Sequence, residues 1–244
     1  MHYNFLFNGC SFTFGAELQG PNNDLEHQKS HRFSHLVGEH YNKTYNNISK
    51  SGKSNDWIVE NTINWFEEGN TCDIAIIQFT TKLRTILYDK TEKEYDIIKP
   101  VSIGSPIWKH SIEKKISNNI TLANDFYKQI YTDYYGHQNY YKNLFLMSKY
   151  LKYRNINTIF LTIYTSQQKY SRGYELHCSD IKIEPISGSI IPNRIENKSF
   201  YCKDYASISK DYSYWLNGTH PNELGHQKIA EYLISEIDKN QYLV

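Results

Sequence analysis

The sequence lacks the features that mark secreted, membrane-spanning and disulfide-rich proteins. Its four cysteines form no Cys-x-x-Cys pair and no regular spacing, so we expect reduced, mostly buried thiols in a protein made in the cytoplasm. The N-terminal segment has no basic region followed by an apolar stretch, and we therefore expect no signal peptide. No apolar run approaches the ~18 residues that a membrane-spanning helix needs, so no membrane partner is expected.

A strong charge of either sign is also missing. The 27 basic and 26 acidic residues give a net charge of +1, which offers no electrostatic support for binding nucleic acid or an anionic membrane. Internal repeats and low-complexity tracts are absent, and 244 residues suit one α/β domain. What the chain does have is tyrosine, with 22 residues whose rings are suited to stacking on sugars.

Short apolar runs predict the strands of a parallel sheet. Three of them, Tyr3–Asn8, Asp73–Phe79 and Asn157–Tyr164, are continuous enough to be buried on both faces. A fourth and weaker run covers Thr44–Ser49. Helical periodicity separates these runs, as in a doubly wound sheet.

The helices are predicted to begin near Phe33, near Trp57, near Leu122 and at Glu223. The helix from Leu122 is expected to continue to about Tyr153. These elements predict a three-layer α/β/α fold with a mainly parallel sheet of about five strands. We expect a single domain over residues 1–244.

Two stretches do not fit the alternation of strands and helices. Residues of about 85–118 and about 165–215 contain scattered glycine, proline, serine and charge. Long segments of this kind are usually functional, so we expect insertions near the ligand crevice.

Ser11 is the first residue of chemical interest. It follows Gly9 and Cys10 directly after the first predicted strand. The carboxyl ends of strands line the ligand crevice of a doubly wound sheet, so a serine there can act as a nucleophile. Its backbone N–H can help to bind an oxyanion. A plain helix cap is the alternative interpretation.

His220 is the matching base. It lies in Asn-Gly-Thr-His-Pro, in a turn directly before the last predicted helix. Histidine side chains ordinarily titrate at about pH 6.5, so this one can accept a serine proton at neutral pH. A capping or surface histidine is the alternative.

Together these segments resemble the SGNH/GDSL hydrolases, a family of serine esterases, deacetylases and thioesterases on a flavodoxin-like sheet. Gly9-Cys10-Ser11 is similar to the block that carries the nucleophile, and 47–55 is similar to the second block, whose glycine N–H is an oxyanion donor. The resemblance gives that role to Gly52 and the role of base to His220. The Thr-His-Pro-Asn…Gly-His run is similar to the form found in phage and marine bacterial members, which implies association with a virion if a phage encodes the chain.

The chain departs from the family pattern at two blocks that surround the nucleophile. Cys10 stands where aspartate is usual; the position supports the turn, and a Cys10 nucleophile is the alternative. The third block, Gly-x-Asn-Asp in the family, reads Gln78-Phe-Thr80-Thr81 here. The hydroxyl of Thr80 or Thr81 can replace the missing amide as an oxyanion donor.

The third departure is Asn217, at the position of the triad acid. An amide oxygen can accept the Nδ1–H of His220, but it cannot stabilise an imidazolium as a carboxylate does. The site is therefore a Ser-His-Asn triad or a Ser-His dyad, unless Asp211 or Asp204 supplies a carboxylate.

The resemblance implies a serine esterase that needs no cofactor or metal. Its substrate would be an O-acetyl group on a carbohydrate or a small acyl ester, bound by Asn55, Arg84 and Trp215. The alternative is an inactive binding or structural protein of the same fold, such as a virion or glycan-binding component. The oligomeric state is not predicted.

A row of histidines offers possible zinc ligands. His27, His31 and His35 follow one another at intervals of four, with His40 beyond. Three ligands on successive turns of one helix rarely close on one ion, so we expect a solvated histidine-rich face.

Overall fold

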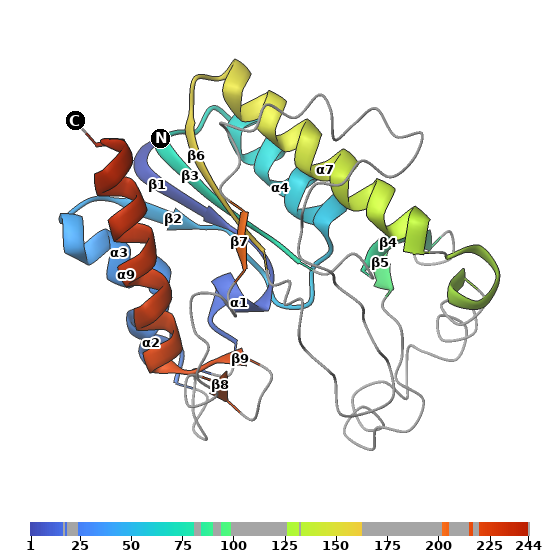
Figure 1. The fold of residues 1–244 in the computed structure, drawn as a ribbon, viewed down its shortest axis with the longest axis horizontal. Coiled ribbons are helices and arrows are strands. Elements are labelled where there is room, and N and C mark those ends of the chain that lie inside the picture. Colours follow the sequence, from blue (N-terminus) through green and yellow to red (C-terminus); the bar gives the residue numbers. More distant parts are fainter. Residues whose placement is uncertain are drawn as a thin grey trace.

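The structure, a computed structural model, describes most of the chain (Figure 1). The residues that it describes are 1–16, 18, 24–80, 84–89, 94–98, 126–131, 133–162, 202–204, 215–216 and 220–243.

A five-stranded sheet forms the centre of the molecule. Its strands lie in the order β2–β1–β3–β6–β7, and every neighbouring pair is parallel. The strands are β1 (His2–Asn8), β2 (Tyr45–Asn47), β3 (Thr71–Phe79), β6 (Asn157–Thr162) and β7 (Cys202–Asp204). Because the strands are parallel, their carboxyl ends share one edge of the sheet, and the segments that follow them meet there.

The apolar runs form strands because the sheet is buried on both faces. Phe5 and Phe7 belong to one apolar cluster, and Leu6 between them belongs to another. All three side chains are fully buried. Successive residues of a strand point to opposite faces, so a strand between two helical layers needs apolar residues at every position.

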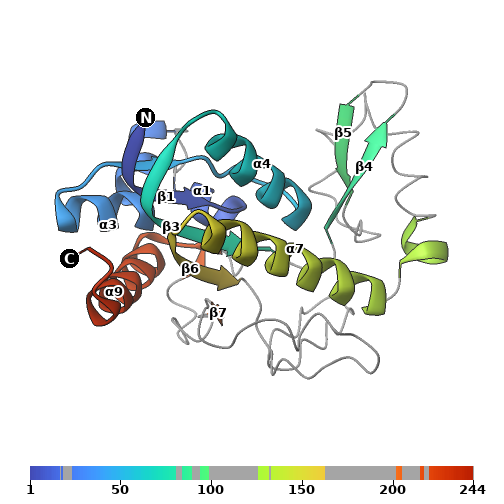
Figure 2. The ribbon, with the colours of Figure 1, turned by 90° about the horizontal axis from the view of Figure 1, so that it is seen from above.

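Helices cover both faces of this sheet (Figures 1 and 2). One face carries α3 (Phe33–Tyr41) and α9 (Glu223–Asn240), and the other carries α4 (Asn55–Glu67) and α7 (Asp133–Tyr153). This three-layer α/β/α arrangement with a mainly parallel sheet confirms the fold class predicted from the sequence.

Shorter elements lie around these layers. They are α1 (Ser11–Phe14), α2 (Leu25–His31), the π-helix η2 (Phe126–Ile130), the antiparallel pair β4 (Thr85–Asp89) and β5 (Glu94–Ile98), and the antiparallel pair β8 (Trp215–Leu216) and β9 (His220–Pro221). The helix expected to begin near Leu122 begins at Asp133 instead, and η2 precedes it.

The two predicted insertions fall largely outside the described residues. The first of them, about 85–118, contains the β4–β5 pair. The second, about 165–215, contains β7, which pairs with Phe160–Thr162 and so contributes the edge strand of the sheet. That these insertions lie near the ligand crevice of a single domain stays a prediction.

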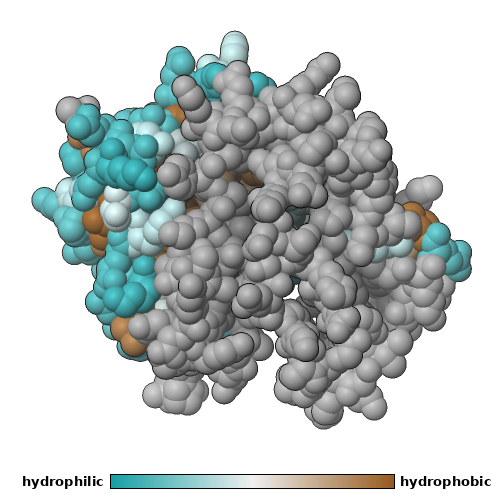
Figure 3. Space-filling model, in the orientation of Figure 1, coloured by the Kyte–Doolittle hydropathy of each residue, from teal (hydrophilic) through white to brown (hydrophobic). Residues whose placement is uncertain are grey.

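The described surface on the side of α2, α3 and α9 is mostly hydrophilic, with a few scattered hydrophobic residues (Figure 3). Within the described ranges, no helix combines the length and the apolar character that crossing a membrane requires.

Candidate active site

The turn between β1 and α1 places Ser11 at the carboxyl edge of the sheet. Ser11 is the first residue of α1 and is 3% exposed. The turn is possible because residue 9 is glycine: a Cβ atom there would lie 2.5 Å from Thr13 Oγ1 and 2.7 Å from Gln78 Oε1. Gly15 ends the helix with φ of 77°, a left-handed conformation that favours glycine. The sequence therefore confines Ser11 to a short, tightly packed helix.

Gln78, near the end of β3, connects this turn to the sheet. Its Oε1 accepts hydrogen bonds from the Cys10 N–H (3.0 Å), the Thr13 hydroxyl (3.1 Å) and the Cys10 thiol (3.3 Å). Its Nε2 donates to the carbonyl of Phe79 at 2.7 Å. The side chain is fully buried. No sequence motif assigns this role to Gln78, although a glutamine inside an apolar strand is itself a signal, because buried amides need partners.

Cys10 faces the core beneath Ser11. Its side chain is fully buried, and the Ser11 hydroxyl donates to its sulfur at 3.8 Å. Burial disfavours the thiolate, but the Arg84 guanidinium, the Phe12 N–H and the adjacent Thr80 hydroxyl favour it, and together they hold the pKa of Cys10 below its ordinary value of 9.0. These contacts support the interpretation that Cys10 stabilises the turn.

Two asparagine side chains hold the same turn from its other sides. Asn8 accepts from the Gly9 N–H (2.8 Å) and donates to the Thr62 hydroxyl (2.8 Å). Asn47, at the end of β2, donates to the carbonyl of Thr13 at 3.0 Å. The backbone around Ser11 is therefore tied to β1, β2, β3 and α4 by amide groups.

Gly52 lies in the turn after β2, beside the turn between β1 and α1. The Lys50 N–H donates to the carbonyl of Gly9 at 3.3 Å, which joins the two turns. Gly52 has φ of 78°, and no atom lies within 4 Å of the position that its Cβ would occupy. No residue in the described part of the chain accepts a hydrogen bond from the Ser11 or Gly52 N–H. Both groups can therefore serve as the oxyanion donors that the sequence predicts.

Asn55 and Thr80 form a reciprocal contact at the end of β3. Asn55 Oδ1 accepts from the Thr80 N–H (2.7 Å), and Asn55 Nδ2 donates to the Thr80 carbonyl (3.1 Å). Both side chains are buried. Arg84 donates to the carbonyl of Lys53 at 3.2 Å. The roles of Asn55 and Arg84 in substrate binding, and of Thr80 as an oxyanion donor, stay predictions.

His220 is brought to the helix that carries the nucleophile. It lies on β9, which contacts α1 (Figure 1), and its ring is 5.3 Å from the ring of Phe12, the residue after Ser11. Trp215 is paired with Pro221 through the backbone of β8. The segment after the first strand and the segment before the last helix thus meet at the edge of the sheet where the sequence predicts a nucleophile and a base.

The group that orients His220 is not defined by these contacts. Asn217 and Asp211 lie outside the described residues. Asp204 is the last residue of β7, so its backbone lies at the same edge of the sheet as Ser11.

The second histidine of the C-terminal motif, His226, is a structural residue. Its ring is fully buried and stacked on Phe33 with centroids 5.6 Å apart, and its Nδ1 accepts the Phe33 N–H at 3.2 Å. Burial, helped by the charges of His220 and Arg32, lowers the pKa of His226 from 6.5 to about 3.

This buried imidazole should make the protein sensitive to acid. Between pH 6.5 and about 3 the unfolded chain binds a proton that the folded chain does not, so stability falls as the pH falls through that window. We expect a contribution of about 1.4 kcal/mol per pH unit in urea unfolding measured from pH 6 to pH 4. The His226→Asn variant, which keeps an acceptor for Phe33, should show a correspondingly shallower dependence. The exposed His40→Ala variant should follow the wild type, and equal slopes for all three would contradict the assignment.

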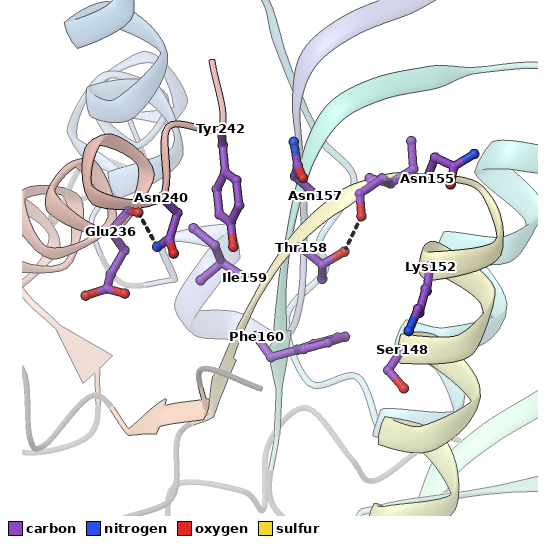
Figure 4. A pocket seen from close by; sticks show the side chains of 11 residues that line it. Ser148, Lys152, Asn155, Asn157, Thr158, Ile159, Phe160, Glu236, Asn240 and Tyr242 are labelled. Carbon is purple, nitrogen blue, oxygen red and sulfur yellow. Dashed lines mark hydrogen bonds between the residues drawn. The ribbon is translucent and has the colours of Figure 1, made fainter. Parts of the chain in front are cut away.

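A pocket of about 390 Å³ lies where β6 begins (Figure 4). Because the strands are parallel, this is the amino edge of the sheet, and Ser11 lies at the carboxyl edge. The pocket is bounded by α7, the start of β6 and the end of α9, with Lys152 and Glu236 on facing helices. In the described part of the chain, β7 pairs only with Phe160–Thr162 of β6. The pocket lies beside the earlier residues of β6, which have no strand next to them on that side in the described ranges. It contains none of the predicted site residues.

No family model and no curated protein matches the chain. Solved structures do. The psychrotrophic esterase EstA from Pseudoalteromonas sp., in a structure inhibited by monoethylphosphonate, is similar with a TM-score of 0.51 at 12% identity, over 97% of each chain. A carbohydrate esterase, described as having an active site with divergent catalytic and non-catalytic binding functions, is similar with a TM-score of 0.52 at 13% identity, over 96% of this chain and 68% of that one. The chain therefore has the three-layer fold of the SGNH hydrolases, the family that its motifs resemble.

Proposed function

We propose that the protein is a serine esterase of SGNH type, with Ser11 as the nucleophile and His220 as the general base. The observation that carries the proposal is the contact between α1, which begins with Ser11, and β9, which contains His220. Ser11 begins α1 at the carboxyl edge of the sheet, and His220 packs on Phe12 of the same helix.

The reaction follows from these positions. The Ser11 hydroxyl attacks the acyl carbon while His220 accepts its proton. The N–H groups of Ser11 and Gly52 bind the oxyanion of the tetrahedral intermediate, and His220 then protonates the leaving alcohol. Water attacks the acyl-enzyme with His220 again as the base, which regenerates Ser11. In this proposal the amide of Asn217 orients His220, or the two residues act as a dyad.

The substrate that we propose is an O-acetylated carbohydrate, with a small acyl ester as the second choice. Similarity to a solved carbohydrate esterase and the high tyrosine content support this choice. Arg84 and Trp215 would contact the substrate from the loops after β3 and before His220, and Asn55 would act with them.

A binding protein of the same fold is the second proposal. The Ser11 hydroxyl donates to the Cys10 sulfur at 3.8 Å, and Thr80 lies against the same thiol. By the family resemblance, Thr80 would stand where a side-chain amide is the usual oxyanion donor. Loss of one oxyanion donor typically costs about 10²–10³ in rate. A chain with this site would keep an affinity for glycans while hydrolysing little.

A fluorophosphonate probe distinguishes the two proposals. It phosphonylates an activated serine and releases fluoride, so mass spectrometry should find the label on Ser11 of the wild type. Labelling should be lost in Ser11→Ala and slowed in His220→Ala. Ser148→Ala, which removes a hydroxyl on α7 at the distant pocket, is the matched control. If the wild type is not labelled and hydrolyses p-nitrophenyl acetate no faster than both active-site variants, the esterase proposal fails and glycan binding should be measured instead.

A further inference from the structure

Two histidines of α2 meet the first residue of α9 on the surface of the molecule. His27 and His31 are four residues apart, and their rings stack with centroids 3.9 Å apart. His27 Nε2 is 2.7 Å from Glu223 Oε1, although 196 residues separate the two in the sequence. One ligand atom from each of the three residues lies within 4.8 Å of the others. The sequence predicted a solvated histidine face because it could not reveal the carboxylate opposite.

The two helices that carry these side chains are held in place by other contacts. Asp24 accepts from the His27 N–H at 3.0 Å and caps α2, and Asn222 accepts from the Gly225 N–H at 2.9 Å and caps α9. Gln28, between the histidines, is buried and donates to the carbonyl of Gly15 at 2.9 Å. The backbone positions of the three residues are therefore set by contacts that do not depend on the interaction between their side chains.

The hydrogen bonds of His31 assign its proton. Its Nδ1 lies 2.8 Å from the carbonyl oxygen of His27 and 2.9 Å from the Ser30 hydroxyl. Because a carbonyl oxygen only accepts, the tautomer with the proton on Nδ1 satisfies the first contact and leaves a lone pair on Nε2. Histidine ligands of metals are commonly oriented in this way, with one ring nitrogen donating to a backbone carbonyl.

His27 and Glu223 supply the other two donors. Without a metal, the contact between His27 Nε2 and the Glu223 carboxylate requires a proton on Nε2, which a divalent ion would displace. The side chains are 37% and 57% exposed, so an ion can enter from solvent and keep water as a fourth ligand. Modest rotations of these side chains would bring three donors to the ~2.0–2.2 Å bond lengths of zinc.

We propose that His27, His31 and Glu223 form a binding site for Zn²⁺ or a similar divalent transition metal. The ion joins α2 to α9. Its ligand on α9, Glu223, lies three residues after His220 in the chain. Its role is to fix the two helices to each other, and it takes no part in the chemistry proposed at Ser11. The proposal does not rest on esterase activity.

Zinc titration of the metal-stripped, full-length chain tests the proposal. Competition with a chromophoric chelator should show one ion per chain. At free zinc near 100 times Kd, Tm should rise by about 5–10 °C. His27→Ala and Glu223→Gln should each weaken binding by at least about 10–100-fold, the loss typical even of groups outside the ligand shell. Glu223→Gln keeps the shape of an exposed side chain, so its folding is not at risk.

The control is His2→Ala. It removes a comparable exposed histidine–carboxylate pair, in which His2 Nε2 lies 3.3 Å from Asp73 Oδ1. Its zinc affinity should equal that of the wild type. Cobalt should bind without the near-ultraviolet charge-transfer band of a thiolate ligand, which would indicate the cysteines instead. Absence of zinc binding at micromolar concentrations, full affinity in both site variants, or a thiolate band would each overturn the proposal.

Discussion

Replacing His220 with alanine is expected to lower kcat/KM for ester hydrolysis by about 10²- to 10⁴-fold, the usual contribution of a positioned general acid–base group. The reason is that His220 packs against the helix that Ser11 begins, through the ring of Phe12, and is the base that we propose for Ser11. His220 is half-buried in a short strand, so its removal should affect turnover far more than folding. Hydrolysis of p-nitrophenyl acetate is the assay, with circular dichroism to verify the fold.

His40→Ala is the matched control for this prediction, because His40 is exposed on α3. Its kcat/KM should remain at the wild-type value. Added imidazole should restore part of the activity of His220→Ala by acting as a diffusible base. Activity of His220→Ala within a few-fold of the wild type would show that another group takes the proton of Ser11.

Replacing Gln78 with methionine should destabilise the protein by about 3–5 kcal/mol. The new side chain has a similar length but accepts no comparable hydrogen bond. The Cys10 N–H, the Thr13 hydroxyl and the carbonyl of Phe79 would each lose a buried partner. Each orphaned group costs about 1–3 kcal/mol. Urea unfolding measures the loss.

Gln129→Met is the control, because it makes the same substitution at a residue that is exposed on η2. Surface substitutions usually change stability by no more than about 0.5 kcal/mol. The Gln78 variant should also lose activity, since the turn that holds Ser11 depends on the missing bonds. A Gln78→Met protein as stable as Gln129→Met would show that the amide does not anchor the turn.

The sheet was predictable from the sequence where local pattern alone determines the structure. The run predicted at Asp73–Phe79 is contained in β3, and the last helix begins at Glu223 as expected. β3 is buried between two helical layers, and α9 is buried along one face. Burial of this kind requires a regular spacing of apolar residues, which is visible in the sequence itself. β7 was missed, because a three-residue edge strand is defined by its pairing with β6 rather than by its own residues.

The active site divides in the same way. The positions of Ser11 after β1 and of His220 before α9 were predictable, because each lies at a strand end or helix start with recognisable neighbours. Their chemical roles stay predictions. The function of Gln78 was not predictable, since it depends on contacts with Cys10 and Thr13, which are 68 and 65 residues away. The position of Glu223 beside His27 is a tertiary contact of the same kind, which no helical periodicity could reveal.

Uncharged amide side chains hold the turn between β1 and α1, so the shape of this turn should depend little on pH and salt. Asn8, Asn47 and Gln78 hold the backbone around Ser11, and none of them can gain or lose a proton in water. Dissolved ions screen full charges strongly, whereas short amide hydrogen bonds in a buried turn are little affected. The shape of the turn should therefore be the same in acidic and neutral solution and at low and high salt, as long as the chain stays folded. A bell-shaped or sigmoidal pH–rate profile would then report the titration of the reacting groups and not a change in the structure of the turn.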